Sequence, residues 1–289
     1  MARKIKQPLV DPNTGELIDT SLFVELEPGD RLITKTQQKY IQKKNARYED
    51  PTDFVWLNFQ YGTNVEFGVD RAVAVRFLYF GTACGNDGII QANKLMQAKL
   101  NLDKNQQTAF LKQTVQSGLL SRNGSALFVN PGIISRGEYS ADSDHIRIFS
   151  DFYRKLCESA PRQTDLNRIY YFIQMIPYLN RQTNILSHSQ TEQDKERVAY
   201  MSFNEFCGKI NCNTAHSAKL KQQLLDFRVY DELIIGFFDN ISELTPQGKY
   251  AVLNPRLCFG GDRSNSNYKE IRALFENEKG VYLLSKENE

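Results

Sequence analysis

Residues 101–137 read NLDKNQQTAFLKQTVQSGLLSRNGSALFVNPGIISRG, and this stretch decides the expected fold. Asp103 followed three residues later by Gln106 is the capping-box pattern that begins a helix, because each side chain can bond the backbone N–H of the other residue. Gly118 stands where a left-handed residue often ends a helix. The pattern predicts a helix from Asp103 to about Ser117.

The two faces of this helix differ in chemistry. At about 100° per residue, Phe110, Leu111 and Val115 share one face, which we expect to point inward. The opposite face carries Asn105, Ala109, Lys112, Gln113 and Gln116. An outer face of amide and ammonium groups suits a helix that lies in the major groove of DNA.

A β-hairpin is expected directly after the helix. Apolar residues at 119–120 and 127–129 flank a polar turn, and Asn123-Gly124 is the strongest short hairpin signal because both turn residues need positive φ. Arg122 would then lie at the tip. Helix and hairpin together predict the DNA-reading end of a winged helix-turn-helix. An ordinary amphipathic helix and hairpin in an α+β domain is the alternative.

An internal repeat favours the DNA-reading interpretation. FVNPGIISRGE (128–138) matches VLNPRLCFGGD (252–262). IRIFSDF (146–152) is more weakly similar to KEIRALF (269–275). A shift of 110 residues places Leu100, Phe110, Val115 and Leu119 on Ile210, Leu220, Leu225 and Val229. The same shift places the polar face on Ala215, Lys219, Gln222, Gln223 and Asp226. Since apolar and polar positions both recur, we infer two copies of one unit.

Length and composition fit this interpretation. The chain of 289 residues is long enough for two domains, and 41% hydrophobic with 24% charged residues is typical of soluble globular proteins. The five cysteines form no CxxC pair, which fits a reduced cytosolic protein. No apolar run is long enough to span a membrane, and the basic N-terminus lacks the apolar core of a signal peptide. We therefore expect a cytoplasmic protein, bound to the nucleoid or to the DNA of a mobile element.

Charge is distributed unevenly despite a net charge of only +2. The segment 31–47 contains no acidic residue and six basic ones, which are Arg31, Lys35, Lys39, Lys43, Lys44 and Arg47. Five of them recur at every fourth position and would form a stripe along a helix. A solvated surface helix is the alternative. Like charges four residues apart destabilise a helix by a few tenths of a kcal/mol per pair, which favours a phosphate partner.

The expected fold class is mainly α with small β wings, an α+β fold with two tandem winged helix-turn-helix domains. Residues 1–67 would contain an N-terminal hairpin, the basic segment and an apolar strand region. Residues 68–140 and 164–263 would be the two domains, separated by a linker helix in 141–163 and followed by a C-terminal helix and tail in 264–289. The expected elements include a hairpin over Leu9–Phe23, a buried apolar stretch over Phe54–Phe67, a helix capped by Asp70 and ended by Gly85, a strand at Ile89–Ile90, a helix over His145–Leu156, a helix capped by Thr164, a helix pair at Ser202–Gly208 and Asn213–Phe227, and a helix over Tyr268–Asn277.

The sequence offers little support for catalysis. It contains no GxxxxGK loop for a nucleoside triphosphate, and its three histidines stand far apart. Cys207, Cys212 and His216 would be three soft metal ligands, but the cysteines fall near expected core positions and a fourth ligand is missing. The sequence therefore predicts a non-enzymatic protein without metal or cofactor.

Three stretches together resemble a known family. They are LVDPNTGELID (9–19), KLMQAKLNLDKNQQTAFLKQTVQSGLLSRNGSALFVNPGIISRG (94–137) and the second Asn-Pro segment with its following glycine. They resemble the RepL-type plasmid replication proteins, part of a wider set of phage and plasmid winged-helix proteins. The resemblance covers roughly residues 9–140. Such proteins usually contain one winged helix, whereas this chain repeats it; the doubling resembles, in architecture, the two-winged-helix initiators of other plasmids.

The residues and the resemblance lead to one expected function, sequence-specific binding of double-stranded DNA by a phage or plasmid protein, most simply in replication initiation or its control. A transcriptional regulator, or an adaptor whose second domain mediates dimerisation, is the alternative. The expected partners are double-stranded DNA, a second copy of the chain, and replication or transcription machinery, with no membrane. The residues expected to contact DNA are Arg31, Lys35, Lys39, Lys43, Arg47, Lys94, Lys104, Asn105, Ala109, Lys112, Gln113, Arg122, Asn123, Lys219, Gln222 and Gln223.

Overall fold

The computed structural model describes residues 53–85, 102–124, 126–137, 144–160, 162–194, 196–239, 241 and 249–276, together with five two-residue strands. The chain divides into two compact units, Met1–Asp50 and Pro51–Glu289. In the first unit, β1 (Arg3–Lys4) pairs with β4 (Val24–Glu25) and β2 (Leu9–Val10) pairs with β3 (Leu17–Ile18), all antiparallel. The β2–β3 pair confirms the hairpin predicted near the N-terminus.

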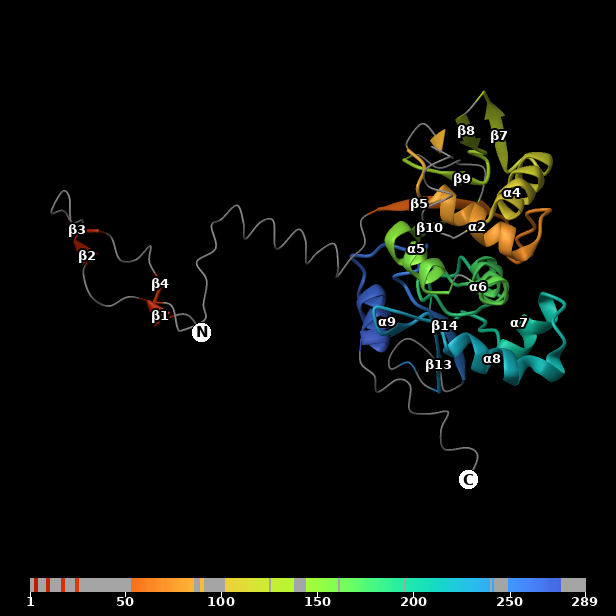
Figure 1. Ribbon diagram of the computed structural model, residues 1–289. Helices are drawn as coiled ribbons and strands as arrows, with labels where there is room; N and C mark the ends of the chain where they lie inside the picture. Colours follow the sequence, from red (N-terminus) through yellow and green to blue (C-terminus); the bar gives the residue numbers. More distant parts are fainter. Residues whose placement is uncertain are drawn as a thin grey trace. The chain divides into compact units, whose positions relative to one another are not determined.

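The second unit is mixed α and β, with small antiparallel sheets (Figure 1). Its described helices are α2 (Arg71–Gly81), α4 (Lys104–Gln116), α5 (Ser150–Ser159), α6 (Gln163–Met175), α7 (Phe203–Lys209), α8 (Ser217–Leu225) and α9 (Ser266–Glu276), with 3-10 turns η2 (Ile176–Tyr178) and η3 (Thr214–His216). Its described strands are β5 (Phe54–Phe59), β6 (Ile89–Ile90), β7 (Leu120–Asn123), β8 (Ala126–Val129), β9 (Ile134–Ser135), β10 (Asp144–Phe149), β11 (Arg228–Val229), β12 (Glu232–Leu233), β13 (Ile235–Phe238), β14 (Tyr250–Leu253) and β15 (Cys258–Phe259). No helix in these ranges is long and apolar enough to cross a membrane.

A four-stranded sheet with the order β15-β10-β5-β9 lies at the centre of this unit. The strands β5 and β10 pair over six residues, and Val55, Leu57, Ile146 and Ile148 on one face are buried. The predicted single helix over His145–Leu156 is therefore wrong in its first half. Apolar residues at alternate positions fit a strand, and pairing with β5 gives this segment a partner that a helix would not have.

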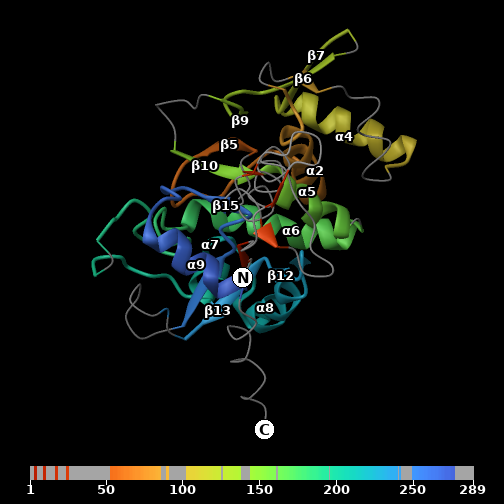
Figure 2. The ribbon, with the colours of Figure 1, turned by 90° about the vertical axis from the view of Figure 1, so that its left-hand side faces the viewer.

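The helix α2 forms the middle of the core. Every residue from Ala72 to Gly81 is buried, and α2 packs against α6, α5 and α4 (Figure 2). Asp70 is the N-cap residue as predicted, but the helix ends at Gly81 rather than near Gly85. A Cβ on Gly81 would lie 2.5 Å from Cδ1 of Ile134 in β9, so glycine allows the helix to approach the sheet edge closely.

The predicted helix α4 is confirmed with its cap. Asp103 and Gln106 form the capping box, and Gly118 has a φ of +73° just after the helix. Its buried side chains are Phe110 and Thr114, four residues apart, so Val115 lies well off the buried stripe and is 40% exposed. The prediction that Val115 points inward is therefore wrong.

The hairpin after α4 is present, and its turn is shifted by one residue. Asn123 pairs with Ala126 across β7 and β8, so Asn123 ends the first strand instead of lying in the turn. Gly124 has a φ of +59°, a left-handed value that glycine adopts without steric cost. The strand β6 pairs with β8 as expected, which gives a three-stranded sheet of order β6-β8-β7.

The second half repeats this arrangement. Ile185 bridges to Val252 in β14, and β14 pairs with β13, so the order of the three segments matches β6-β8-β7. The helices α7 and α8 confirm the predicted second pair, with Ser202 and Glu205 forming another capping box. The helix α6 begins at Gln163, so Thr164 is not its N-cap. The echo between 146–152 and 269–275 is wrong, because the first begins as a strand and the second lies in α9.

The repeated Asn-Pro corners make the same three hydrogen bonds. Asn130 Nδ2 donates to the Gly118 carbonyl at 2.9 Å, Asn130 N–H donates to Leu119 at 3.0 Å, and Asn130 Oδ1 accepts from Gly132 N–H at 2.9 Å. The corresponding bonds of Asn254 join the Leu233 carbonyl at 2.8 Å, the Ile234 carbonyl at 2.8 Å and the Arg256 N–H at 2.9 Å. The match of Leu119 to Val229 is thus wrong: Leu119 corresponds to Ile234, because the hairpin β11–β12 is inserted after α8.

The inserted hairpin carries a buried ionic network. Glu232 in β12 accepts hydrogen bonds from Arg256 at 2.7 Å and from Arg272 in α9 at 3.1 Å, and these side chains are at most 13% exposed. Asn254 Nδ2 also donates to Glu232 at 3.2 Å. One carboxylate therefore ties the inserted hairpin, the Asn-Pro corner and α9 together, and the second half is joined more firmly at its corner than the first.

We expect Asn254→Ala to lower the free energy of unfolding by about 2–4 kcal/mol, since a fully buried carbonyl and N–H would lose their partner. Asn130→Ala is the matched control. Asn130 is only half-buried, so water can replace its bonds and the expected loss is about 1 kcal/mol. Urea denaturation followed by circular dichroism measures both. Equal losses for the two variants would contradict the difference assigned to burial.

Candidate nucleic-acid interface

The outer face of α4 is polar and accessible. Its exposed residues are Lys104, Asn105, Thr108, Ala109, Lys112, Val115 and Gln116. Within the part of the chain that the structure describes, the side chains of Lys104, Asn105 and Lys112 make no hydrogen bond or ion pair. The helix itself contains no acidic residue. The face thus presents two ammonium groups and an amide with unused bonding capacity, while its inner side packs on α2.

The β7–β8 hairpin extends the polar surface beyond the end of α4. Ser121, Arg122, Asn123 and Gly124 are all exposed. Arg122 Nε donates to the Gly124 carbonyl at 2.9 Å, which holds the guanidinium close to the turn. The structure therefore places Arg122 and Asn123 at the hairpin tip as predicted.

One predicted contact residue has a structural role. Gln113 Nε2 donates to the Asp70 carboxylate at 2.7 Å, and Gln113 Oε1 accepts from the Asp70 N–H at 3.0 Å. Both ends of the amide are occupied, and the pair joins α4 to the first turn of α2. Gln113 therefore holds the helix in place rather than presenting a free amide. The reason is that the Asp70 carboxylate, which could have capped its own helix, bonds to α4 instead.

The α8 surface is similar in position and weaker in charge. The equivalents Ala215, Lys219, Gln222 and Asp226 are exposed, whereas Gln223 is half-buried. Asp226 adds a negative charge where α4 has Gln116. The described face of α8 therefore offers one ammonium group and one carboxylate, where α4 offers two ammonium groups.

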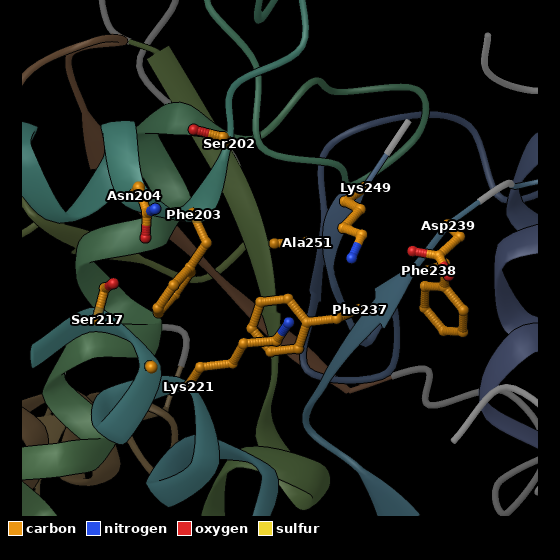
Figure 3. A pocket seen from close by; sticks show the side chains of 11 residues that line it. Ser202, Phe203, Asn204, Ser217, Lys221, Phe237, Phe238, Asp239, Lys249 and Ala251 are labelled. Carbon is orange, nitrogen blue, oxygen red and sulfur yellow. The ribbon is translucent and has the colours of Figure 1, made fainter. Parts of the chain in front are cut away.

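A pocket of about 340 Å³ lies beside α8, between the start of α7 and the β13–β14 hairpin (Figure 3). The Phe203 and Phe237 rings meet edge to face there, with centroids 5.2 Å apart. The Lys221 ammonium lies 4.3 Å from the Phe237 centroid, and Figure 3 shows Lys249 extending toward the same ring. Asp239 lines the far side. Two ammonium groups thus lie between the helix and the hairpin of the second half.

Lys221 and Lys249 were missed by the sequence argument. Lys221 falls beside the apolar stripe of α8, and Lys249 precedes the strand β14, so neither belongs to a helix face that periodicity identifies. Lys249 directly precedes Tyr250, which pairs with Phe238 of β13.

Some predicted residues cannot be placed. Lys94 and the basic segment with Arg31, Lys35, Lys39, Lys43 and Arg47 lie outside the described residues. The interface described here therefore rests on α4, the β7–β8 hairpin and the corresponding part of the second half.

The cysteines near α7 are structural. Cys207 is fully buried, and burial raises the pKa of its thiol to about 12. A buried thiol with a raised pKa stays protonated near neutral pH and is therefore a weak nucleophile. Over the described ranges, no three His, Cys, Asp or Glu side chains form a group that could hold a metal ion.

Comparisons of the chain with protein-family models, with curated proteins and with solved structures found no match.

We expect Gln113→Ala to lower the free energy of unfolding by about 1 kcal/mol, because it removes both bonds to Asp70. Gln116→Ala, an exposed amide on the same helix, is the matched control and should change stability by less than about 0.5 kcal/mol. Urea denaturation measures both. If Gln113→Ala left stability unchanged but altered base preference on DNA, Gln113 would be a contact residue and the assigned role would be wrong.

Proposed function

We propose that the protein binds specific sequences of double-stranded DNA through α4 and the β7–β8 hairpin, without catalysing a reaction. The observation that carries this proposal is the outer face of α4, where exposed lysine and asparagine side chains flank a hairpin with an exposed arginine. The helix itself contains two lysines and no acidic residue on this surface, so it presents a net positive charge. A polyanion with hydrogen-bonding base edges matches both their charge and their chemistry.

The arrangement of elements supports a winged helix-turn-helix in each half. In the first half, α4 is followed by a hairpin whose second strand, β8, pairs with the short strand β6, in the order β6-β8-β7. In the second half, α7 and α8 precede the β13–β14 hairpin, and Ile185 supplies the short strand. In such a domain the second helix enters the major groove and the hairpin contacts the neighbouring backbone.

The side chains divide into two roles. Lys104, Lys112 and Arg122 bind phosphate, and this positions the helix without reading sequence. Asn105 donates to and accepts from an adenine edge, which only an amide does in both directions. Ala109 and Val115, exposed on the same face, supply apolar contact of the kind that recognises a thymine methyl group.

The biological role that we propose rests on the resemblance of the sequence to RepL-type plasmid proteins. We propose replication initiation or its control on a phage or plasmid, with homodimerisation and recruitment of replication machinery as further possibilities for the second half. A transcriptional regulator is the second candidate, and an adaptor is the third, favoured by the weaker charge of α8 and by Asp226. The test is to sequence the DNA fragments that the full chain retains from the genomes of the host and of the phage or plasmid. Replication origins would indicate an initiator, promoters a transcriptional regulator, and no specific site an adaptor.

Lys112→Ala should weaken binding to all DNA sequences alike and reduce the slope of log K against log salt by about one, because one phosphate contact and its released counterion are lost. Lys269→Ala is the matched control, since Lys269 is an exposed lysine on α9. Fluorescence anisotropy with a labelled duplex between low and moderate salt measures the slope. An unchanged slope for Lys112→Ala, or the same change for Lys269→Ala, would contradict the assigned phosphate contact.

Asn105→Ala should act on specificity instead of on general affinity. We expect a loss of about 1–3 kcal/mol on the preferred site and little change on random DNA, because the amide contacts a base edge. Competition binding with specific and random duplexes measures the difference. Thr108→Ala, an exposed neighbour on the same face, is the control. Equal losses on both kinds of DNA would mean that Asn105 does not read bases.

A further inference from the structure

The two halves are related by a twofold rotation that can be derived from the register of the central sheet. In the first half, Trp56 pairs with Ser135 and Leu57 with Ile134. In the second half, Arg147 pairs with Phe259 and Ile148 with Cys258. Each residue of β5 corresponds to the residue 91 positions later in β10. Each residue of β9 corresponds to the residue 124 positions later in β15, which is also the offset between Asn130 and Asn254. Both strand pairs are therefore equivalent residue by residue.

A backbone hydrogen bond from β5 or β10 to the residue just before the partner strand shows the same offsets. Asn58 N–H donates to the Ile133 carbonyl at 2.9 Å, and Phe149 N–H donates to the Leu257 carbonyl at 3.0 Å. The equivalence thus extends from the strand β5 or β10 to the turn that follows the Asn-Pro corner. The strand register and this hydrogen bond do not depend on sequence similarity, and both give the same correspondence between the two halves.

The axis of this transformation passes between Trp56 and Arg147. These residues are equivalent under the offset of 91, and they also pair directly with each other across β5 and β10. When a residue pairs with its own equivalent in an antiparallel ladder, the twofold axis passes midway between the two residues and is normal to the sheet. The order β15-β10-β5-β9 reads as the same sequence of equivalent strands from either edge, as this axis requires.

The helices follow the same rotation. The buried residues of α4, Phe110 and Thr114, correspond to Leu220 and Leu224 of α8, which are also buried. The helix α4 packs on α2, α8 packs on α6, and α2 packs on α6. Figure 1 shows α4 and α8 on one side of the central strands, at opposite ends of the unit. Rotation about the axis therefore exchanges α4 and α8 without moving either to the other face of the sheet.

We infer that one chain reads two DNA half-sites of opposite orientation, an inference that rests on the DNA binding proposed above. Reading helices related by a twofold axis meet the two DNA strands with opposite polarity, as in symmetric dimers on palindromic operators. Directly repeated half-sites would need a translation between the helices, and the central sheet imposes a rotation. The two half-sites differ in base sequence, since α4 presents Asn105 and Lys112 where α8 presents Ala215 and Gln222.

The orientation of the two half-sites can be tested with a symmetrised chain, a variant in which the α8 surface carries residues of the α4 surface. The substitutions Ala215→Asn, Lys219→Ala, Gln222→Lys and Asp226→Gln place four exposed side chains of the α4 surface at the equivalent positions on and beside α8, and all four positions are exposed. The full chain and this variant are each used to select duplexes from a random library, with thermal unfolding as the check that the variant folds. The reciprocal variant, Asn105→Ala, Ala109→Lys, Lys112→Gln and Gln116→Asp, serves if the first does not fold.

The unaltered chain should select an asymmetric site with two different half-sites. The symmetrised chain should select an inverted repeat of one of these two half-sites. One chain should bind each site, about 100-fold more tightly than the same half-sites in direct orientation, because only the inverted arrangement engages both helices at once. Selection of a direct repeat, or of a single half-site, would overturn the inference while leaving DNA binding intact. If neither chain enriches any sequence, the proposed function itself fails.

Discussion

The antiparallel pairing of β5 with β10 is the contact on which the rest of the second unit depends. Its inner face, with Val55, Leu57, Ile146 and Ile148, is buried almost completely against the helices. The two strands come from different halves of the repeat, so neither half could cover its own apolar strand without the other. Burial of four such side chains is worth several kcal/mol, roughly 1.5–3 kcal/mol each. The duplicated chain therefore folds as one compact unit rather than as two independent domains on a linker.

Hydrogen-bonded polar groups at the ends of the sheet fix how each hairpin leaves it. Asn130 and Asn254 bond the backbone on both sides of the Asn-Pro corner, and the following proline cannot compete for those partners because it has no N–H. In the second half, Glu232 adds charged bonds to Arg256 and Arg272. Such pairs are costly to break once buried. The positions of the hairpins relative to the helices α4 and α8 follow from these bonds.

The candidate interface follows from the same packing. The helix α4 uses Phe110 and Thr114 against the core, and the bond between Gln113 and Asp70 sets its rotation relative to α2. What remains on the outside is a strip of lysine, asparagine and small side chains. The twofold relation places a second helix, α8, in the equivalent position with different side chains. These two unlike surfaces suit the asymmetric DNA site that we propose.

The sequence by itself determined the local elements: the capping box that begins α4, the hairpin after each second helix, and the repeated Asn-Pro corner. These depend on interactions within a few residues, so periodicity and turn chemistry reveal them. Only the tertiary structure decided that 144–149 is a strand, that Val115 faces outward and that Gln113 bonds to Asp70, because each depends on a partner far along the chain. The twofold axis between Trp56 and Arg147 was also decided by the tertiary structure. The repeat could be read from the sequence, but the rotation that relates its two copies arises only when β5 pairs with β10.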